Sequence, residues 1–280
     1  MKRANQPQEL RNQVTAWRDE GARIGFVPTM GALHEGHLSL VRLARGRGAK
    51  VIVSVFVNPA QFGPKEDLGT YPRQLERDAE LLAGAGCDLL FVPGVETIYP
   101  PGYDTWISVE GPSTGLEGDE RPGHFRGVAT VVYRLFQLVR PDFAVFGEKD
   151  AQQLAVVRQL VRDLELGIEI VAGETVREPD GLAMSSRNVY LDPDERRAAA
   201  VLHRALALAA EAVRRGERRS AEILRLVRAE LESEPRVQID YAAVVDADSF
   251  QSVETVSGRC VVPIAVRIGK TRLIDNLQLA

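Results

Sequence analysis

Strand-like runs alternate with helix-like runs before residue 176, and this alternation constrains the fold more than any other feature of the chain. Short apolar runs bounded by turn residues are typical of buried strands, whereas apolar residues that recur every three to four positions are typical of helices. The strand-like runs cover residues 24–27, 51–57, 88–92, 143–146 and 168–171. The helix-like runs between them include residues 73–85, 124–138 and 151–164. Such alternation predicts an α/β fold with a parallel sheet and helical crossovers.

The pattern changes after about Val176, which predicts a second structural unit. Two helix-like runs rich in arginine, glutamate, alanine and leucine come first, at residues 194–214 and 220–232. Strand-like runs follow at residues 239–245, 259–266 and 271–277. Two helices followed by strands indicate an α+β unit. We therefore expect one domain over residues 1–176 and a smaller α+β domain over residues 177–280.

Composition narrows the class of function. The chain has 35 basic and 39 acidic residues and a net charge of −4, which argues against non-specific binding to nucleic acid or a membrane surface. Cys87 and Cys260 form no CxxC pair and are expected to be reduced, buried thiols. Residues 1–13 lack the apolar core of a signal peptide, and no run approaches the roughly 18 apolar residues of a membrane span. We expect a cytoplasmic protein.

A histidine-glycine-histidine turn joins the first strand-like run to a helix-like run. Residues 28–37 read Pro-Thr-Met-Gly-Ala-Leu-His-Glu-Gly-His, and apolar residues at helical spacing follow from Leu38. A helix that begins near His37 directs unpaired backbone N–H groups and the positive end of its dipole at the turn. Gly36 would let an anion approach the backbone without a Cβ in the way. The turn therefore predicts a site for nucleotide phosphates.

The two histidines also allow a metal-binding interpretation. The helical His-Glu-x-x-His motif of zinc hydrolases places its histidines four residues apart, with the glutamate as base. Here His34 and His37 are three residues apart, and the other histidines are His124 and His203. A zinc hydrolase is therefore the weaker hypothesis.

Polar clusters follow two further strand-like runs. Residues 58–62 read Asn-Pro-Ala-Gln-Phe, and residues 147–153 read Gly-Glu-Lys-Asp-Ala-Gln-Gln. Ligands collect beyond the carboxyl ends of strands in open parallel sheets, so we expect these clusters to lie beside the histidine turn. Another cluster, Met-Ser-Ser-Arg-Asn at residues 184–188, lies near the predicted domain joint. Its hydroxyls and guanidinium can bind phosphate oxygens, since arginine binds two at once.

Together these segments resemble the pantoate:β-alanine ligase family, the pantothenate synthetases of the nucleotidyltransferase superfamily with HxGH-type turns. The resemblance covers essentially the whole chain, and the set of motifs is far more specific than any one of them. In the family's order they are Pro-Thr-Met-Gly-Ala-Leu-His-Glu-Gly-His, Phe-Val-Asn-Pro-x-Gln-Phe, Tyr-Pro-Arg, Arg-Pro-Gly-His-Phe-Arg-Gly-Val, Gly-Glu-Lys-Asp-x-Gln-Gln and Met-Ser-Ser-Arg-Asn.

The resemblance implies a Rossmann-like nucleotide- and pantoate-binding domain over residues 1–176 and a C-terminal α+β lid domain over residues 177–280. It also implies ATP-dependent condensation of pantoate with β-alanine through an enzyme-bound pantoyl adenylate, with release of AMP and pyrophosphate. Magnesium and a homodimer formed through the first domain are implied as well.

The same resemblance assigns roles to individual residues. Catalytic roles are implied for His34, His37, Lys149 and Arg187. ATP binding is implied for Met30, His34, His37, Gly147, Lys149, Asp150, Val176, Met184, Ser185, Ser186 and Arg187. Pantoate binding is implied for Met30, Gln61 and Gln153. Asp78 matches a position associated with the metal, but Arg77 stands where some relatives have a second acid. Magnesium is therefore expected to be bound to the ATP phosphates, with few direct protein ligands.

The chemistry calls for these residue types independently. A carboxylate must gain a good leaving group, by attacking the α-phosphate, before an amine can displace it, and both reactants are anions. Positive charge and N–H donors must hold them together, which suits His37 and Lys149. The neutral amides of Gln61 and Gln153 can bind pantoate without replacing it as nucleophile.

Two alternatives remain open. Another HxGH-type nucleotidyltransferase would attack ATP with a phosphate group and would need basic residues in place of Gln61 and Gln153. A nucleotide-binding sensor without turnover would gain little from His37 and Lys149, which are aimed at a leaving pyrophosphate.

Overall fold

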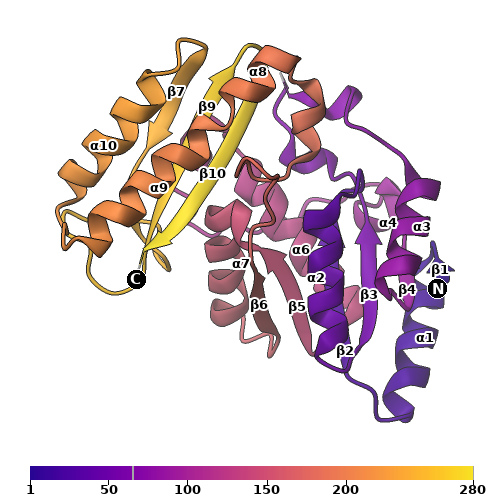
Figure 1. Cartoon of the computed structure of the whole chain (residues 1–280). Helices are drawn as coiled ribbons and strands as arrows, with labels where there is room; N and C mark the ends of the chain where they lie inside the picture. Colours follow the sequence, from indigo (N-terminus) through magenta and orange to yellow (C-terminus); the bar gives the residue numbers. More distant parts are fainter. Residues whose placement is uncertain (65, 280) are drawn as a thin grey trace.

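The larger part of the protein is built on a sheet of six strands in the order β1-β4-β3-β2-β5-β6 (Figure 1). The computed structural model describes residues 1–64 and 66–279. The strands are β1 Lys2–Ala4, β2 Ile24–Thr29, β3 Lys50–Val55, β4 Leu89–Phe91, β5 Phe143–Gly147 and β6 Glu169–Gly173. Every neighbouring pair is parallel, which confirms the predicted sheet. The sequence pattern does not predict β1, because three residues are too few to show a period.

Helices cover both faces of this sheet because successive strand residues point to opposite sides. Phe26 belongs to the apolar core under α1 and α6, and its neighbour Val27 to the core under α2 and α3. The main helices are α1 Pro7–Asp19, α2 Glu35–Gly46, α3 Leu75–Ala85, α6 His124–Val139 and α7 Ala151–Asp163. The shorter ones are α4 Val95–Ile98 and α5 Glu117–Glu120, with the 3-10 helices η1 Pro59–Gln61, η2 Asp67–Gly69, η3 Glu148–Asp150 and η4 Ser186–Tyr190.

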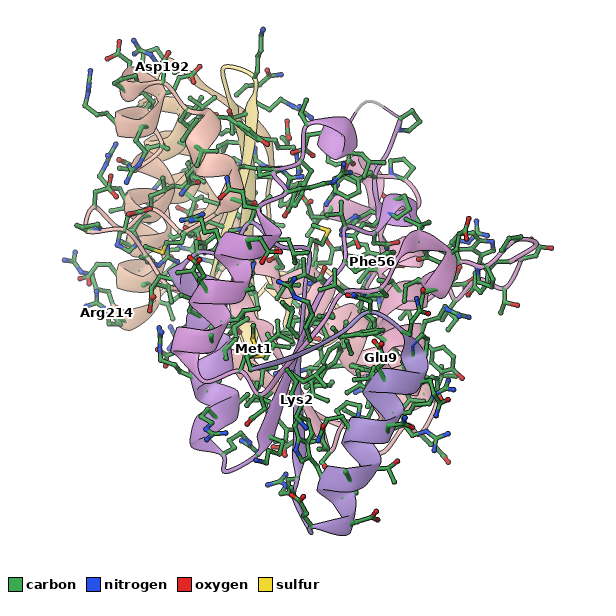
Figure 2. The ribbon with its side chains drawn as sticks, turned by 90° about the vertical axis from the view of Figure 1, so that its right-hand side faces the viewer. Met1, Lys2, Glu9, Phe56, Asp192 and Arg214 are labelled. Carbon is green, nitrogen blue, oxygen red and sulfur yellow. The ribbon has the colours of Figure 1, made fainter. Side chains whose placement is uncertain are left out.

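The C-terminal part forms a second domain with an antiparallel sheet, as expected for an α+β unit. Its strands are β7 Val237–Ala242, β8 Val245–Asp246, β9 Cys260–Ile268 and β10 Thr271–Leu279. Its helices are α8 Pro193–Ala198, α9 Val201–Arg214 and α10 Ser220–Glu232, which share an apolar core with this sheet. In Figure 2, Asp192 and Arg214 mark this helical layer, on the side of the molecule away from Phe56. The boundary at residue 176 stays a prediction.

Two predicted elements of this domain are divided in the structure. The helix predicted over residues 194–214 is two helices, since α8 ends at Ala198 and α9 begins at Val201. Buried apolar residues continue on both sides of the break, so the apolar pattern of the sequence does not show where the helix is interrupted. The strand predicted over residues 239–245 is divided into β7 and β8, and β7 carries a register shift between Ile239 and Tyr241.

Among the described residues, no helix is long and apolar enough to cross a membrane.

Buried charges connect the two domains. Glu117 on α5 accepts hydrogen bonds from Arg272 of β10, with an Nη1–Oε2 distance of 3.0 Å and an Nη2–Oε1 distance of 2.5 Å. The Tyr241 hydroxyl donates to the same carboxylate at 2.9 Å. Arg272 also donates through Nε to Asp240 at 2.6 Å. This network holds the C-terminal sheet against the first domain.

We predict that Arg272→Met lowers the free energy of unfolding by about 3–5 kcal/mol, because it leaves buried carboxylates without their main partner. Urea unfolding measures the change. The control is Arg267→Met. The Arg267 side chain is 45% exposed, and its partner Asp240 remains paired with Arg272 in this variant. We expect the free energy of unfolding to fall there by about 1 kcal/mol or less. Equal, small losses in both variants would show that the interdomain network contributes no more than a surface pair.

Candidate active site

A cavity of about 230 Å³ lies where the loops after β2, β3 and β5 meet the segment that leads into the C-terminal domain. This is the carboxyl edge of the parallel sheet, as the sequence predicts. All of the predicted site residues except Asp78 line the cavity: Met30, His34, His37, Gln61, Gly147, Lys149, Asp150, Gln153, Val176, Met184, Ser185, Ser186 and Arg187. The structure thus brings together residues from separate motifs along the chain.

The helix after the histidine turn begins earlier than the sequence predicts. α2 begins at Glu35, with His34 as its N-cap, and His37 already lies in the first turn. The Nδ1 atom of His34 accepts a hydrogen bond from the Gly36 amide at 3.2 Å, and the Nδ1 atom of His37 accepts one from the His34 amide at 3.3 Å. The expected start near His37 is wrong because two imidazoles form the cap that serine and glutamate form in a usual capping box.

Both histidines are neutral donors. Burial lowers the pKa of His34 to about 4, and nearby Lys149 adds to the effect. Burial, followed by the neighbouring His34, lowers the pKa of His37 to about 3. Because each Nδ1 atom accepts a backbone N–H, the proton of each neutral ring is on Nε2. The cavity therefore has two N–H donors whose rings lie 4.1 Å apart, centre to centre.

Gly36 makes room for His34. A Cβ at Gly36 would lie 2.9 Å from Cε1 and 3.0 Å from Nδ1 of the His34 ring. Such distances are too short for real contacts, so a side chain here would displace the capping imidazole. The sequence predicts room for an anion at this glycine, and the structure adds a second reason for its presence.

Asp78 lies behind the turn and does not line the cavity. Its side chain is buried, with the residue 1% exposed, and accepts hydrogen bonds from the Ala32 amide at 3.0 Å and the Leu33 amide at 2.8 Å. Among the described residues, no three His, Cys, Asp or Glu side chains gather as metal ligands. The assignment of Asp78 to a metal stays a prediction, and this geometry gives it no support.

The amide of Gln61 is oriented by Asn58, a residue to which the sequence analysis gives no role. Asn58 is buried and donates through Nδ2 to Oε1 of Gln61 at 3.0 Å. Its own Oδ1 accepts the hydroxyl of Tyr99 at 2.8 Å. The Gln61 Nε2 group is consequently left as a donor, and it lies 3.1 Å from the sulfur of Met30.

The two adjacent glutamines of α7 have different surroundings. The Gln152 side chain is buried and bonds to the backbone of the segment before α5, accepting from the Glu117 amide at 3.1 Å and donating to the Pro112 and Gly115 oxygens at 3.1 Å. Gln153 lines the cavity instead. The assignment of Gln153 to pantoate stays a prediction.

Arg121 and His124 are further cavity residues without a predicted role. His124 donates through Nδ1 to the backbone oxygen of Gln61 at 2.9 Å, and its Nε2 faces the Arg121 guanidinium at 3.1 Å. Burial, with Arg121 beside it, lowers the pKa of His124 to about 4, so the ring is neutral. Arg121 is fixed in turn by Glu66 at 2.7 Å. Both residues belong to the Arg-Pro-Gly-His-Phe-Arg-Gly-Val motif. This motif contributes to the family resemblance, and it could have pointed to both residues as part of the site.

Lys149 is held at the end of β5 by the C-terminal domain. The side chain of Asn276 on β10 donates to the backbone oxygens of Glu148 at 2.9 Å and Lys149 at 2.8 Å. The Lys149 ammonium lies 3.7 Å from the Asp150 carboxylate. Burial acts to raise the pKa of Asp150, but Lys149 and Arg187 outweigh it and leave that pKa lowered. The cavity therefore carries a positioned cation beside an ionised carboxylate.

Arg187 brings a third cation to the cavity, beside Arg121 and Lys149. Ser185 caps η4 by accepting the Arg187 amide at 3.3 Å. The guanidinium bonds to both oxygens of Asp67 on η2, at 3.0 and 3.3 Å. This pair connects the segment before the C-terminal domain to the first domain at the edge of the cavity.

Comparison with known proteins finds relatives that match nearly the whole chain. The chain is 54% identical to the pantothenate synthetase of Moorella thermoacetica over 96% of this chain and 95% of the relative. The crystal structure of pantothenate synthetase from Thermus thermophilus superposes with a TM-score of 0.94 at 50% identity, over 99% of both chains. A pantoate-beta-alanine ligase from Francisella tularensis, complexed with Beta-gamma ATP and Beta-alanine, has a TM-score of 0.80 at 35% identity, over 99% of this chain and 97% of its own.

The family model described as pantoate-beta-alanine ligase matches residues 2–278, nearly the entire chain. On this match, and on the likeness to relatives over their full length, the chain belongs to the pantoate-beta-alanine ligase family.

Proposed function

We propose that this protein condenses pantoate with β-alanine to form pantothenate, using ATP and passing through a pantoyl adenylate, with release of AMP and pyrophosphate. Family membership supports the reaction, and a relative complexed with Beta-gamma ATP and Beta-alanine supports two of the substrates. The observation that carries the proposal is a single cavity that holds two neutral N–H donors, three cations and oriented amides.

The cations and donors suit the leaving pyrophosphate. Charge builds up on the β- and γ-phosphates as pantoate attacks the α-phosphate, so fixed positive charge stabilises the transition state. Lys149 and Arg187 supply that charge, and the Nε2–H groups of His34 and His37 supply donors. Since both imidazoles are neutral, they bind phosphate oxygens without a proton to transfer. Ser185 and Ser186 add hydroxyl donors from the loop that carries Arg187.

The amides and the apolar floor suit pantoate, whose chain carries hydroxyls, a carboxylate and two methyl groups. Gln61 and Gln153 offer amide groups for the polar atoms, with Met30 beside Gln61. Apolar side chains of the cavity suit the methyl groups: Phe56, Val131, Val132 and Leu135. A phosphorylated acceptor would call for cations in place of the two glutamines, which argues against the other nucleotidyltransferases of this type.

The adenosine part of ATP is assigned to the β5 and β6 side of the cavity. Gly147 ends β5, and Asp150 follows in η3. Val176 and Met184 lie on the segment between β6 and η4, and their backbones pair, since the Met184 amide donates to the Val176 oxygen at 3.0 Å. We propose that these residues enclose the base and ribose.

Magnesium does not fit a site held by the protein alone. The described residues include no cluster of metal ligands, and both oxygens of Asp78 accept backbone amides. We propose that magnesium enters bound to ATP, keeps several water ligands, and neutralises phosphate charge. No residue of this chain is assigned to hold it.

The C-terminal domain is proposed to act as a lid, beginning at about residue 177. Arg187 and Ser185 lie on its first segment, before α8, and Asn276 of its sheet bonds to the turn that carries Lys149. Closure would exclude water from an acyl adenylate that water would otherwise hydrolyse. A homodimer formed through the first domain is proposed from the family resemblance alone, and the cytoplasmic location stays a prediction from the sequence.

The two-step reaction predicts that the enzyme exchanges labelled pyrophosphate into ATP when pantoate is present and β-alanine is absent. Exchange requires that the adenylate forms reversibly before the amine enters. The controls omit pantoate or replace it with β-alanine, and neither should support exchange. A requirement for both pantoate and β-alanine would rule out a separate adenylate step.

Lys149→Met is predicted to lower the rate of this exchange by about a hundredfold to a thousandfold, the usual effect of removing one well-aimed donor from developing charge. The matched control is Lys50→Met, because Lys50 begins β3 and so lies at the opposite edge of the sheet. Both variants should melt within a few degrees of the parent. Near-normal exchange in the Lys149 variant would remove this residue from the mechanism.

A further inference from the structure

We propose that Asp78 is a positioning residue that sets the histidine turn, and that it does not bind the metal. The role of the turn in this inference rests on the proposed function. The way in which Asp78 holds the turn rests on the geometry alone. Asp78 lies in the first turn of α3, and its carboxylate accepts the amides of Ala32 at 3.0 Å and Leu33 at 2.8 Å. Each oxygen therefore has a fixed donor. The residue is 1% exposed and does not line the cavity, so a hydrated ion has no access to it.

The loop that Asp78 holds has an unfavourable backbone. Gly31 has a φ of +84° and Ala32 a φ of +51°, and an alanine rarely adopts the left-handed region. Two hydrogen bonds to an ionised acceptor are stronger than neutral ones and compensate for this conformation. Without the carboxylate, we expect Ala32 to relax to negative φ and the chain beyond it to change direction.

The position of both imidazoles follows from this loop. Leu33 is followed directly by His34, whose amide donates to Nδ1 of His37 and whose own Nδ1 accepts the Gly36 amide. A shift of Leu33 therefore moves the amide that orients His37 and the ring that caps α2. Displacement by about 1 Å from a change outside the reacting centre can cost about a hundredfold in rate.

The amide of Gln61 in the pantoate site is supported separately. Gln61 is oriented by Asn58 and held through its backbone oxygen by His124, and neither contact involves Asp78. The proposal therefore predicts a divided effect: the adenylation rate falls while the affinity for pantoate stays. A metal ligand would instead change the dependence on magnesium.

Two variants test this. Asp78→Asn keeps the shape of the side chain but removes the charge and one acceptor. Gly31→Ala keeps the carboxylate, but its Cβ would lie 3.0 Å from Oδ2 of Asp78 and 3.1 Å from Cγ1 of Val55 at a φ of +84°, so the loop must move. The control is Glu80→Gln, an exposed acid on the same helix. Labelled pyrophosphate exchange is measured against ATP, pantoate and free magnesium, and the imidazole nitrogens are followed by NMR without substrates.

Both Asp78→Asn and Gly31→Ala should lower the maximal exchange rate by about a hundredfold, with the half-saturating magnesium concentration within about twofold of the parent. KM for pantoate should stay within about twofold of the parent in Asp78→Asn, whereas Gly31→Ala also moves the neighbouring Met30 and should raise it. Their NMR spectra should lose the common Nδ1-acceptor pattern of His34 and His37, whereas Glu80→Gln should match the parent throughout. A tenfold rise in the magnesium requirement of Asp78→Asn alone, rescued by excess magnesium, would overturn the proposal, as would a near-normal rate in either variant. Absence of exchange in the parent would count against the proposed reaction, and the NMR comparison would still decide the role of Asp78.

Discussion

The hydrogen bonds from two backbone amides to the Asp78 carboxylate determine where the histidine turn lies, and the orientation of both turn imidazoles depends on that turn. The carboxylate comes from α3, while the amides come from the loop between β2 and α2. The loop leads to His34, which caps α2 with its own ring. The buried contact between α3 and the loop after β2 thereby sets the orientation of the His34 and His37 side chains at the cavity.

Cations that line the cavity are paired with carboxylates and can also bind a polyanion. Lys149 lies beside Asp150, and Arg187 is bonded to Asp67. These partners fix each cation and limit the repulsion between cations when no anion is bound. Because the histidines are neutral, the cavity stabilises an anion through its fixed cations Lys149, Arg187 and Arg121 and through dipoles, and it does not need to change its protonation. Preorganisation of this kind agrees with a reaction in which positioning and electrostatics do most of the work.

Periodicity and strand ends predicted most of the fold and much of the site. Alternating apolar runs indicated β2 to β6, and the rule that ligands collect at the carboxyl edge brought Gln61, Lys149 and His37 together. The break between α8 and α9 could not be predicted, because buried residues continue across it. The helix start at Glu35 was missed because capping rules look for serine or aspartate, whereas here an imidazole accepts the amide.

The remaining differences at the site concern residues that act through others. Asn58 and His124 hold Gln61 by hydrogen bonds that only the folded chain brings within reach. Asp78 was connected with the metal through the family resemblance. The sequence alone could not show that the backbone already uses both of its oxygens.

A pH titration of the imidazole nitrogens in the parent protein, followed by NMR, shows whether the fold holds both turn histidines as neutral Nε2–H donors. Lowered pKa values of about 4 for His34 and about 3 for His37 mean that the neutral form persists as the pH falls from about 8 to about 5. We expect Nε2–H signals for both rings across that range, with protonation only below about pH 5. Titration of either ring near its ordinary value of about 6.5, or a proton on Nδ1, would contradict it.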